Sequence, residues 1–411
     1  MDNPDELTTG ERIRVLRESR GMSRPVLAGL CGRGPDWLKK IESGERELRS
    51  HTLLLQLAAA LQISDLSVIT GTDAGGTAQP VPLGRLSHPG MPAIWSAVMT
   101  RTLASPAAWA VDPTVLQGRA DQTWRLWHTS NRNRTEVGAL LPSLIRDGEH
   151  AARSLDGEQR RAALVALSDI YRLTGQATAY VAPAELAWVV ADRALSAAQD
   201  ADQPAAIAAS AWNMGNILRE TSYPEEALRV VQEAADLIRP HLDGAPDDWR
   251  GIYGALQLHA AVTAAREGSE GDAWRYWGKG DQVAKSLPAA YVHPSTVFGR
   301  ANVDFHAVSV LTDLKKSQKA LGTADDLDPD VMPSVERRAR LWVEVARGHL
   351  HRGDRTAALH VMQKAHEIGA ETVAFTPSAR VVAADLWRNS PRSMRAETSL
   401  LAKAVGVATV G

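Results

Sequence analysis

Hydrophobic residues recur at helical spacing in short blocks over the first 63 residues of the chain. The blocks predict four or five short helices, among them one over residues 10–20, one ending near 32, one over 35–42 and one over 53–63. Thr8 followed by Glu11 resembles a capping box at the start of the first helix. Ile13 and Leu16 are expected on its buried side, with Val15 as a third candidate. The pattern therefore predicts a small helical domain over residues 1–70.

A stretch rich in glycine and proline follows this domain. Nine of the 22 residues from 71 to 92 are Gly or Pro, and this composition predicts a flexible linker. From about residue 92 onward, amphipathic alanine-rich runs predict helices, and the sequence has no convincing run of alternating β-branched residues. We therefore expect an all-α fold with a second helical domain over residues 93–411.

This second domain contains internal repeats. Segments beginning near Ala211, Leu258 and Leu341 share a layout of small and large residues that resembles a tetratricopeptide repeat, in which small residues let two paired helices cross closely. The corresponding small residues lie 38 to 47 positions apart and are Ala187, Ala227, Ala273, Ala320 and Ala358. We expect a tetratricopeptide-like α-solenoid that senses a signal or dimerises. The alternative is an alanine-rich helical bundle with chance matches.

Composition and charge narrow the class of protein. A single cysteine, Cys31, excludes an intramolecular disulfide framework and fits a reducing compartment. No hydrophobic leader follows the acidic start, and no uncharged apolar run approaches the length of a membrane span, so we expect a cytoplasmic protein. The formal net charge is only −2, but residues 12–49 hold ten Lys and Arg against five acidic residues. A local basic surface of this kind is expected where a small domain meets phosphate groups.

Residues 23–64 resemble the lambda-repressor-like, or xenobiotic-response-element, family of helix-turn-helix domains. The matching residues are Leu27, Ala28, Gly32, Leu38, Ile41, Glu42, Gly44, Leu53, Leu57, Ala58 and Leu61. Ala28 is small where two helices cross, and Gly32 permits the sharp turn between them. The resemblance implies DNA binding through the helix over residues 35–42, and it implies that Glu42 pairs with Arg17 as part of the scaffold.

The resemblance also implies which side chains meet DNA. The family's base-reading positions fall on Gly34, Pro35, Asp36, Lys39 and Lys40. Lys40 is the best candidate for a base contact, because lysine can donate to guanine O6 and N7. Asp36 either accepts from a cytosine or is favoured by the helix dipole in the first turn. The phosphate candidates, which are otherwise ordinary surface arginines, are Arg24, Arg33, Arg46 and Arg49. Trp37 is expected to pack on its own domain.

A helix-turn-helix domain followed by tetratricopeptide-like repeats resembles actinobacterial regulators of this layout and, more loosely, the peptide-receptor regulators of Gram-positive bacteria. Both resemblances imply a homodimer that binds double-stranded DNA at an inverted-repeat operator. Stacked helix pairs form a concave groove lined by the first helix of each pair. The residues expected to line it and to contact a peptide or small-molecule effector are Trp212, Asn216, Arg219, Arg266, Phe305, Arg347 and His351. Asn216 is the most specific of these candidates. It stands in the motif NMGN, although this motif also belongs to the general repeat consensus.

The sequence does not support an enzyme. It contains no Gly-rich phosphate loop in a strand–helix context, no paired cysteine or HExxH metal motif and no paired-carboxylate arrangement. His349, His351 and His360 are close in sequence but are expected to be exposed or packed rather than to bind a metal. We therefore predict a transcriptional regulator without a cofactor, whose repeats sense a peptide, a small molecule or a protein. The alternative is a repeat scaffold that binds a protein partner and has vestigial DNA binding.

Overall fold

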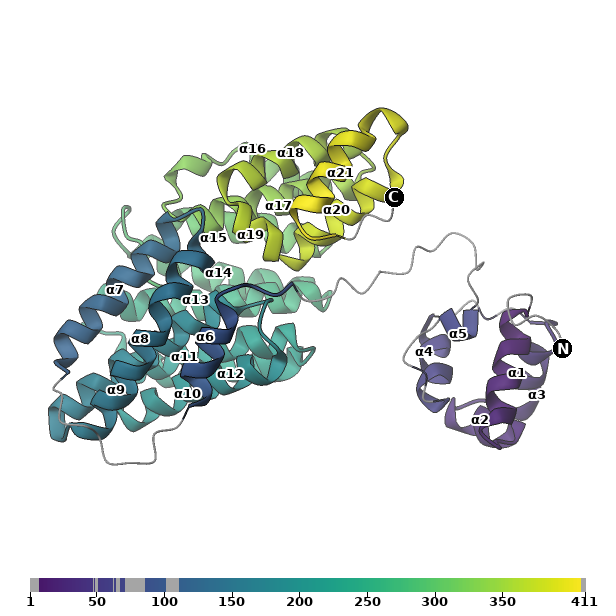
Figure 1. Ribbon diagram of the computed structural model, residues 1–411. Helices are drawn as coiled ribbons and strands as arrows, with labels where there is room; N and C mark the ends of the chain where they lie inside the picture. Colours follow the sequence, from purple (N-terminus) through teal and green to yellow (C-terminus); the bar gives the residue numbers. More distant parts are fainter. Residues whose placement is uncertain are drawn as a thin grey trace. The chain divides into compact units, whose positions relative to one another are not determined.

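The computed structural model describes residues 7–46, 48, 51–61, 63, 67–70, 86–100 and 111–407. The chain divides into two compact units, residues 1–81 and 82–411 (Figure 1). All the regular structure in the described ranges is helical, which confirms the all-α prediction. None of the described helices is long and apolar enough to cross a membrane.

The first unit is built from five short helices. They are α1 (Thr9–Ser19), α2 (Arg24–Leu30), α3 (Pro35–Glu42), α4 (His51–Ala60) and α5 (Ser67–Thr70). One small core joins all five helices, and its fully buried side chains include Ile13, Leu27, Leu38, Leu57 and Ile69. Because each helix is short, packing of one apolar face against this core supplies most of its stability.

Local signals set the helix boundaries in the first unit. The side chain of Thr8 accepts from the backbone N–H of Glu11, whose carboxylate in turn accepts from the backbone N–H of Thr8, so the predicted capping box is present. Gly32 has φ +63°, a value that glycine adopts without strain, and the chain turns there between α2 and α3. Burial of Ile13 is confirmed, but the side chain of Val15 is 51% exposed, so its predicted burial was wrong.

The second unit contains sixteen helices within the described ranges. They are α6 (Met91–Met99), α7 (Pro113–Thr129), α8 (Asn133–Ser154), α9 (Gly157–Thr178), α10 (Ala184–Asp200), α11 (Pro204–Glu220), α12 (Pro224–Ile238), α13 (Asp247–Arg266), α14 (Glu270–Ser286), α15 (Arg300–Asp313), α16 (Ser317–Asp325), α17 (Val335–His351), α18 (Arg355–Ile368), α19 (Ala370–Phe375), α20 (Pro377–Asn389) and α21 (Arg395–Ala404). Of the predicted linker, residues 71–85 lie outside the described part, while His88 is buried in the second unit.

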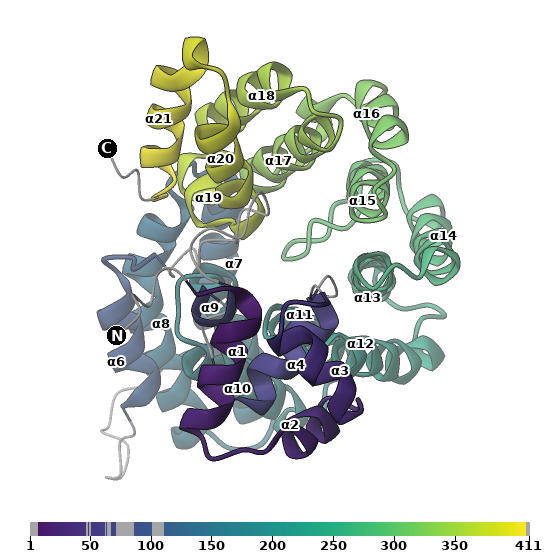
Figure 2. The same cartoon turned by 90° about the vertical axis from the view of Figure 1, so that its right-hand side faces the viewer.

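Consecutive helices of the second unit pack as pairs, and the pairs stack in chain order. α9 packs on α10, α11 on α12, α13 on α14, α15 on α16 and α17 on α18. The first helices of successive pairs also pack on one another, from α9 through α17. Figure 2 shows α14 on the outer side of α13 in this array. Of the five predicted small residues, Ala227, Ala273, Ala320 and Ala358 are buried, whereas Ala187 is only partly buried.

The end of the array returns to its beginning, a feature that the repeat pattern does not predict. α17 contacts α7, and α19 contacts α8. The Glu371 carboxylate of α19 accepts from the backbone N–H groups of Arg134 and Thr135 at 2.8 and 3.1 Å. These N–H groups belong to the first turn of α8, where no carbonyl of the same helix can accept from them. Glu371 therefore caps a helix that lies more than 230 residues earlier in the chain.

Candidate functional site

The first candidate site is the outer face of α3. Pro35 occupies the first helical position, where its missing N–H costs nothing, and Gly34 precedes it in an extended conformation. Leu38 and Ile41 point into the core and anchor the helix. The side chains left exposed on and beside α3 include Arg33, Pro35, Asp36, Lys39, Lys40, Glu45 and Arg46, of which four are basic and two acidic. The helix therefore presents basic groups outward from a fixed scaffold.

Glu42 is the centre of the scaffold behind this face. Its two carboxylate oxygens accept from the Nε atoms of Arg17 and Arg24 at 2.6 and 2.7 Å, respectively. Burial alone would raise the pKa of this carboxyl, but the hydrogen bonds from the two guanidinium groups outweigh burial and lower it. The pairing of Arg17 with Glu42 implied by the family resemblance is thereby confirmed.

The Nε of Arg24, a residue that was expected to contact phosphate, donates to Glu42. Its side chain remains 41% exposed, and the phosphate contact stays a prediction. Trp37 is half-buried and packs against the core of its own unit, as predicted. Arg49 lies outside the described residues.

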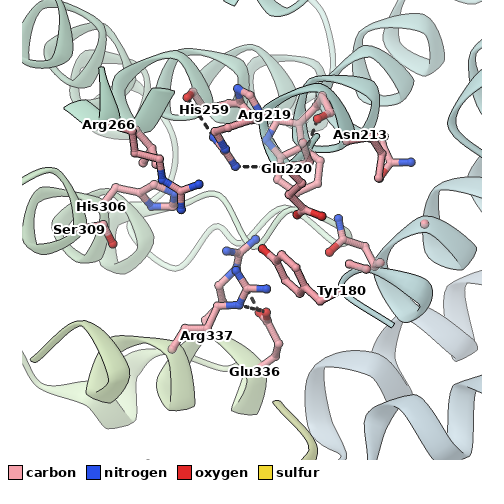
Figure 3. A pocket seen from close by; sticks show the side chains of 18 of the residues that line it. Tyr180, Asn213, Arg219, Glu220, His259, Arg266, His306, Ser309, Glu336 and Arg337 are labelled. Carbon is pink, nitrogen blue, oxygen red and sulfur yellow. Dashed lines mark hydrogen bonds and ion pairs between the residues drawn. The ribbon is translucent and has the colours of Figure 1, made fainter. Parts of the chain in front are cut away.

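The second candidate site is a cavity of about 110 Å³ on the inner side of the stacked helix pairs. Its lining comes from α9, α11, α13, α15 and α17, the first helices of five successive pairs, and from Tyr180 in the loop after α9. Figure 3 shows Arg219 and His259 on one side, with Glu336 and Arg337 on the opposite side. A lining drawn from helices spread over 170 residues exists only once the array is assembled.

Five of the seven predicted effector-binding residues line this cavity. They are Trp212, Asn216, Arg219, Arg266 and Phe305. Arg347 lies beside it and pairs with Asp313 at 2.9 Å. His351 lies elsewhere, with its imidazole Nδ1 3.3 Å from the hydroxyl of Ser317. The amide of Asn216 is used internally, because it accepts from Arg219 at 2.6 Å and donates to the carbonyl of Trp212.

The sequence analysis identified Arg347 on α17 but not the charged residues in the first two turns of this helix. Glu336 is buried and lies 2.5 Å from Nε of Arg340 and 3.4 Å from Nε of Arg337. Burial favours its neutral form, but the positive charges of Arg340, Arg337 and Arg134 outweigh burial and lower its pKa to about 2. The spacing of Glu336 and Arg340 by four residues within a predicted helix was the signal available for this pair.

Three residues around the cavity have an unusual backbone conformation or a shifted pKa. Tyr180 has φ +67°, a value that is unusual for a bulky side chain, and its ring lies 5.5 Å from the guanidinium of Arg340. Burial raises the pKa of Glu220, although a hydrogen bond from Tyr180 and the charge of Arg219 act in the opposite direction. Burial, together with the charge of Arg219, also lowers the pKa of His259 well below its ordinary value. Strained backbone and shifted pKa values are both frequent at functional sites.

Comparison with known proteins identifies the first unit. Residues 9–67 match the family described as a helix-turn-helix domain. No curated protein matches the chain. Among solved structures, BtubC from P. vanneervenii covers 65% of this chain and 95% of its own length, with 11% identity and a TM-score of 0.37. PlcR of Bacillus thuringiensis, solved with the peptide PapR7 and DNA, covers 84% of this chain and 98% of its own, with 12% identity and a TM-score of 0.27.

The match over residues 9–67 agrees with the helices that the structure shows there. α2, the turn at Gly32 and α3 form the two-helix motif, and α1, α4 and α5 complete its core. The N-terminal unit is thus a helix-turn-helix domain, and the second unit is a helical repeat-like body. Within the described residues, no group of His, Cys, Asp and Glu side chains is arranged to hold a metal ion.

Proposed function

We propose that this protein is a sequence-specific DNA-binding transcriptional regulator whose helical body dimerises and senses an effector. The observation that carries the proposal is the helix-turn-helix domain at residues 9–67, with the basic side chains of α3 left exposed. In this motif the second helix enters the major groove and its exposed residues contact base edges. The helix in that position here is α3.

The side chains divide by the contact each would make. Lys39 and Lys40 lie on the exposed face of α3, where a lysine can donate to guanine, and Pro35 and Asp36 stand at its N-terminal end. Arg33 precedes the helix and Arg46 follows it, both exposed and both suited to the phosphate backbone. We retain Arg49 in this group from its place in the sequence. Arg24 contributes to the rigidity of the domain through Glu42, and its partly exposed side chain remains a candidate for a phosphate contact.

The proposed operator is an inverted repeat bound by a homodimer. A single helix-turn-helix domain reads only a few base pairs, and the motif commonly gains affinity by pairing two domains on half-sites one helical turn apart. We propose that the second unit provides the dimer contact and that an effector bound in its cavity alters DNA binding.

The proposal is tested by selecting a binding site from a pool of random duplexes and measuring affinity by mobility shift. Replacing both Lys39 and Lys40 with alanine should weaken binding at least about tenfold, because one base contact alone is worth about 1–3 kcal/mol. The matched control replaces the exposed Lys319 and Lys403 of the second unit, which changes the net charge equally. Selected sites should contain two inverted half-sites.

Two outcomes would contradict the proposal. Unchanged affinity after the Lys39 and Lys40 substitutions would exclude α3 as the recognition helix. Failure to enrich any site, together with binding that salt does not weaken, would exclude sequence-specific regulation, because phosphate contacts make DNA binding fall steeply with salt. Capture of a stable protein partner in that case would favour a repeat scaffold.

A further inference from the structure

The guanidinium of Arg219 projects into the cavity without a carboxylate partner among the described residues. Its three hydrogen bonds go to neutral acceptors: the Asn216 side chain at 2.6 Å, the Thr263 hydroxyl at 3.3 Å and the His259 carbonyl at 3.4 Å. Its buried Nε has no acceptor. A guanidinium carries five N–H donors and a full charge, so this group is incompletely paired. Burying such a charge is costly unless an anion compensates it.

The other charges around the cavity do not compensate Arg219. Asp313 pairs with Arg266 at 3.4 Å and with Arg347 at 2.9 Å, and Arg347 also pairs with Glu344. Two carboxylates and two guanidinium groups are thereby balanced.

Three guanidinium groups remain, those of Arg219, Arg337 and Arg340, against the carboxyl groups of Glu220 and Glu336. Glu336 lies between Arg337 and Arg340, with its carboxylate oxygens 3.4 and 2.5 Å from the two Nε atoms, so one carboxylate faces two guanidinium groups. The lining therefore holds at least one positive charge in excess, and burial shifts Glu220 toward its neutral form, which increases the excess. Figure 3 shows Arg219 and Arg337 pointing toward the same space from opposite sides.

We propose that this cavity binds the anionic head group, a carboxylate or a phosphate, of a small effector, with Arg219 as its principal contact and Arg337 facing it. Guanidinium groups bind both anions through paired N–H donors. The inference rests on the proposed sensing role of the second unit and names the chemistry of its ligand.

The size and walls of the cavity limit the ligand further. A volume of about 110 Å³ is small beside the roughly 300–1,000 Å³ of pockets that enclose drug-sized molecules, so the cavity accepts a head group or a small anion. Trp212 and Phe305 supply apolar surface beside the arginines. A compact anion with a short apolar or aromatic portion fits this lining better than a cation or an extended apolar chain.

The test measures thermal unfolding of the full chain with two probes, inorganic phosphate and benzoate, each against sodium chloride at equal ionic strength. At least one probe should raise the Tm by several degrees, because a ligand that binds only the folded state stabilises it. Arg219→Gln should abolish this shift, and Arg219→Lys, which keeps the charge without the planar fork, should weaken it. A larger rise in Tm with phosphate identifies a phosphate head group, and a larger rise with benzoate identifies a carboxylate.

The control variant is Arg229→Gln, at an exposed arginine of α12 that pairs with Glu233 at 2.8 Å. It should retain the full anion shift. In the sodium chloride reference buffer, without either probe, the Arg219→Gln variant should unfold at the same temperature as the unmodified chain or a higher one, because it removes a partly buried charge that lacks a carboxylate partner. A structural role for Arg219 predicts the reverse, a lower Tm and no dependence on the anion.

Three results would overturn the inference: no stabilisation by either probe beyond sodium chloride, an equal shift in Arg219→Gln, or an equal shift in Arg219→Lys. The mobility shift is measured separately on the same preparations. An anion shift without DNA binding would leave the cavity assignment standing and refute the proposed function. DNA binding without an Arg219-dependent anion shift would refute only this inference.

Discussion

Nε of Arg17 lies 2.6 Å from Oε1 of Glu42, and this buried ion pair joins α1 to the end of α3. Arg17 also donates to the carbonyl of Met22 at 2.9 Å, and Arg24 binds the second oxygen of the same carboxylate. One carboxylate therefore links the three helices that orient the exposed face of α3. The position of Lys39 and Lys40 depends on a residue that does not itself face outward.

Replacing Glu42 with glutamine should destabilise the first unit by about 3–5 kcal/mol, because it removes the buried counter-charge of Arg17 and leaves only the half-exposed Glu18 beside it. Hydrogen exchange of the full chain measures this as faster exchange in α1 to α3 and unchanged exchange in α7 to α18. Glu18→Gln is the control, since Glu18 is half exposed and its pairs with Arg14 and Arg17 are near the surface. It should cost far less, because exposed ion pairs contribute little to stability. Equal effects of the two variants would contradict the central role of Glu42.

Gly10 sets the distance between α1 and α3. A Cβ atom at this position would lie 2.1 Å from the carbonyl oxygen of Ile41, so Gly10→Ala must push the two helices apart. We expect a loss of about 1–3 kcal/mol in the stability of the first unit, the usual cost of overpacking, and weaker DNA binding. Gly29→Ala in α2 is a matched control, because nothing lies within 4 Å of its added Cβ. Alanine there should stabilise the helix by about 0.5–1 kcal/mol. If Gly10→Ala changed neither stability nor DNA binding, the contact between Gly10 and Ile41 would not be tight.

Much of the first unit is encoded in neighbouring residues and is predictable for that reason. Thr8 with Glu11 marks the start of α1, Pro35 marks the start of α3, and Gly32 marks the turn between α2 and α3. These signals act within one or two helical turns. The hydrogen bond from Arg24 to Glu42 could not be predicted from neighbouring residues, because it depends on how α2 packs against α3.

The cavity in the second unit was only partly predictable. The repeat pattern placed Trp212, Arg219 and Phe305 on the inner helices, and these residues do line the cavity. It did not reveal Tyr180, which reaches the cavity from a loop, or Glu336, whose importance comes from the arginines around it. Ion pairs between helices of the assembled array decide which charges remain uncompensated. These ion pairs cannot be predicted from a local sequence pattern.

Glu371 should stabilise the closure between the two ends of the array. Its carboxylate accepts from the backbone N–H groups of Arg134 and Thr135 and from the Thr135 hydroxyl, at the positive end of the α8 dipole. Glu371→Gln removes the charge and should cost about 0.5–2 kcal/mol, the range of an N-terminal cap. Hydrogen exchange should increase in α8 and α19. Glu226→Gln in the exposed first turn of α12 is the control and should cost only a few tenths of a kcal/mol. Unchanged exchange in α8 would exclude the capping role.

Three histidines should make the second unit sensitive to mild acid: His293, which is buried, and His128 and His306, which are partly buried. Burial lowers the pKa of His128 to about 4 and the pKa values of His293 and His306 to about 3, and nearby positive charges act in the same direction on His293 and His306. In the unfolded chain a histidine titrates near pH 6.5, so below that pH the unfolded state binds more protons than the folded one. The stability present above pH 6.5 is therefore lost as the pH falls toward 3, at up to about 1.4 kcal/mol per pH unit for each imidazole.

His293 allows one of these three contributions to be removed. Its Nδ1 accepts from the backbone N–H groups of Ser295 and Thr296 at 3.3 and 3.2 Å, and an asparagine oxygen can take over an acceptor role there without binding a proton. Urea unfolding between pH 7.5 and 5 should show a smaller loss of stability with falling pH for His293→Asn than for the unmodified chain. The difference should approach about 1.4 kcal/mol for each pH unit below 6.5. A His293→Asn chain whose stability falls as steeply as that of the unmodified chain would show that His293 is protonated in the folded state or does not stay buried.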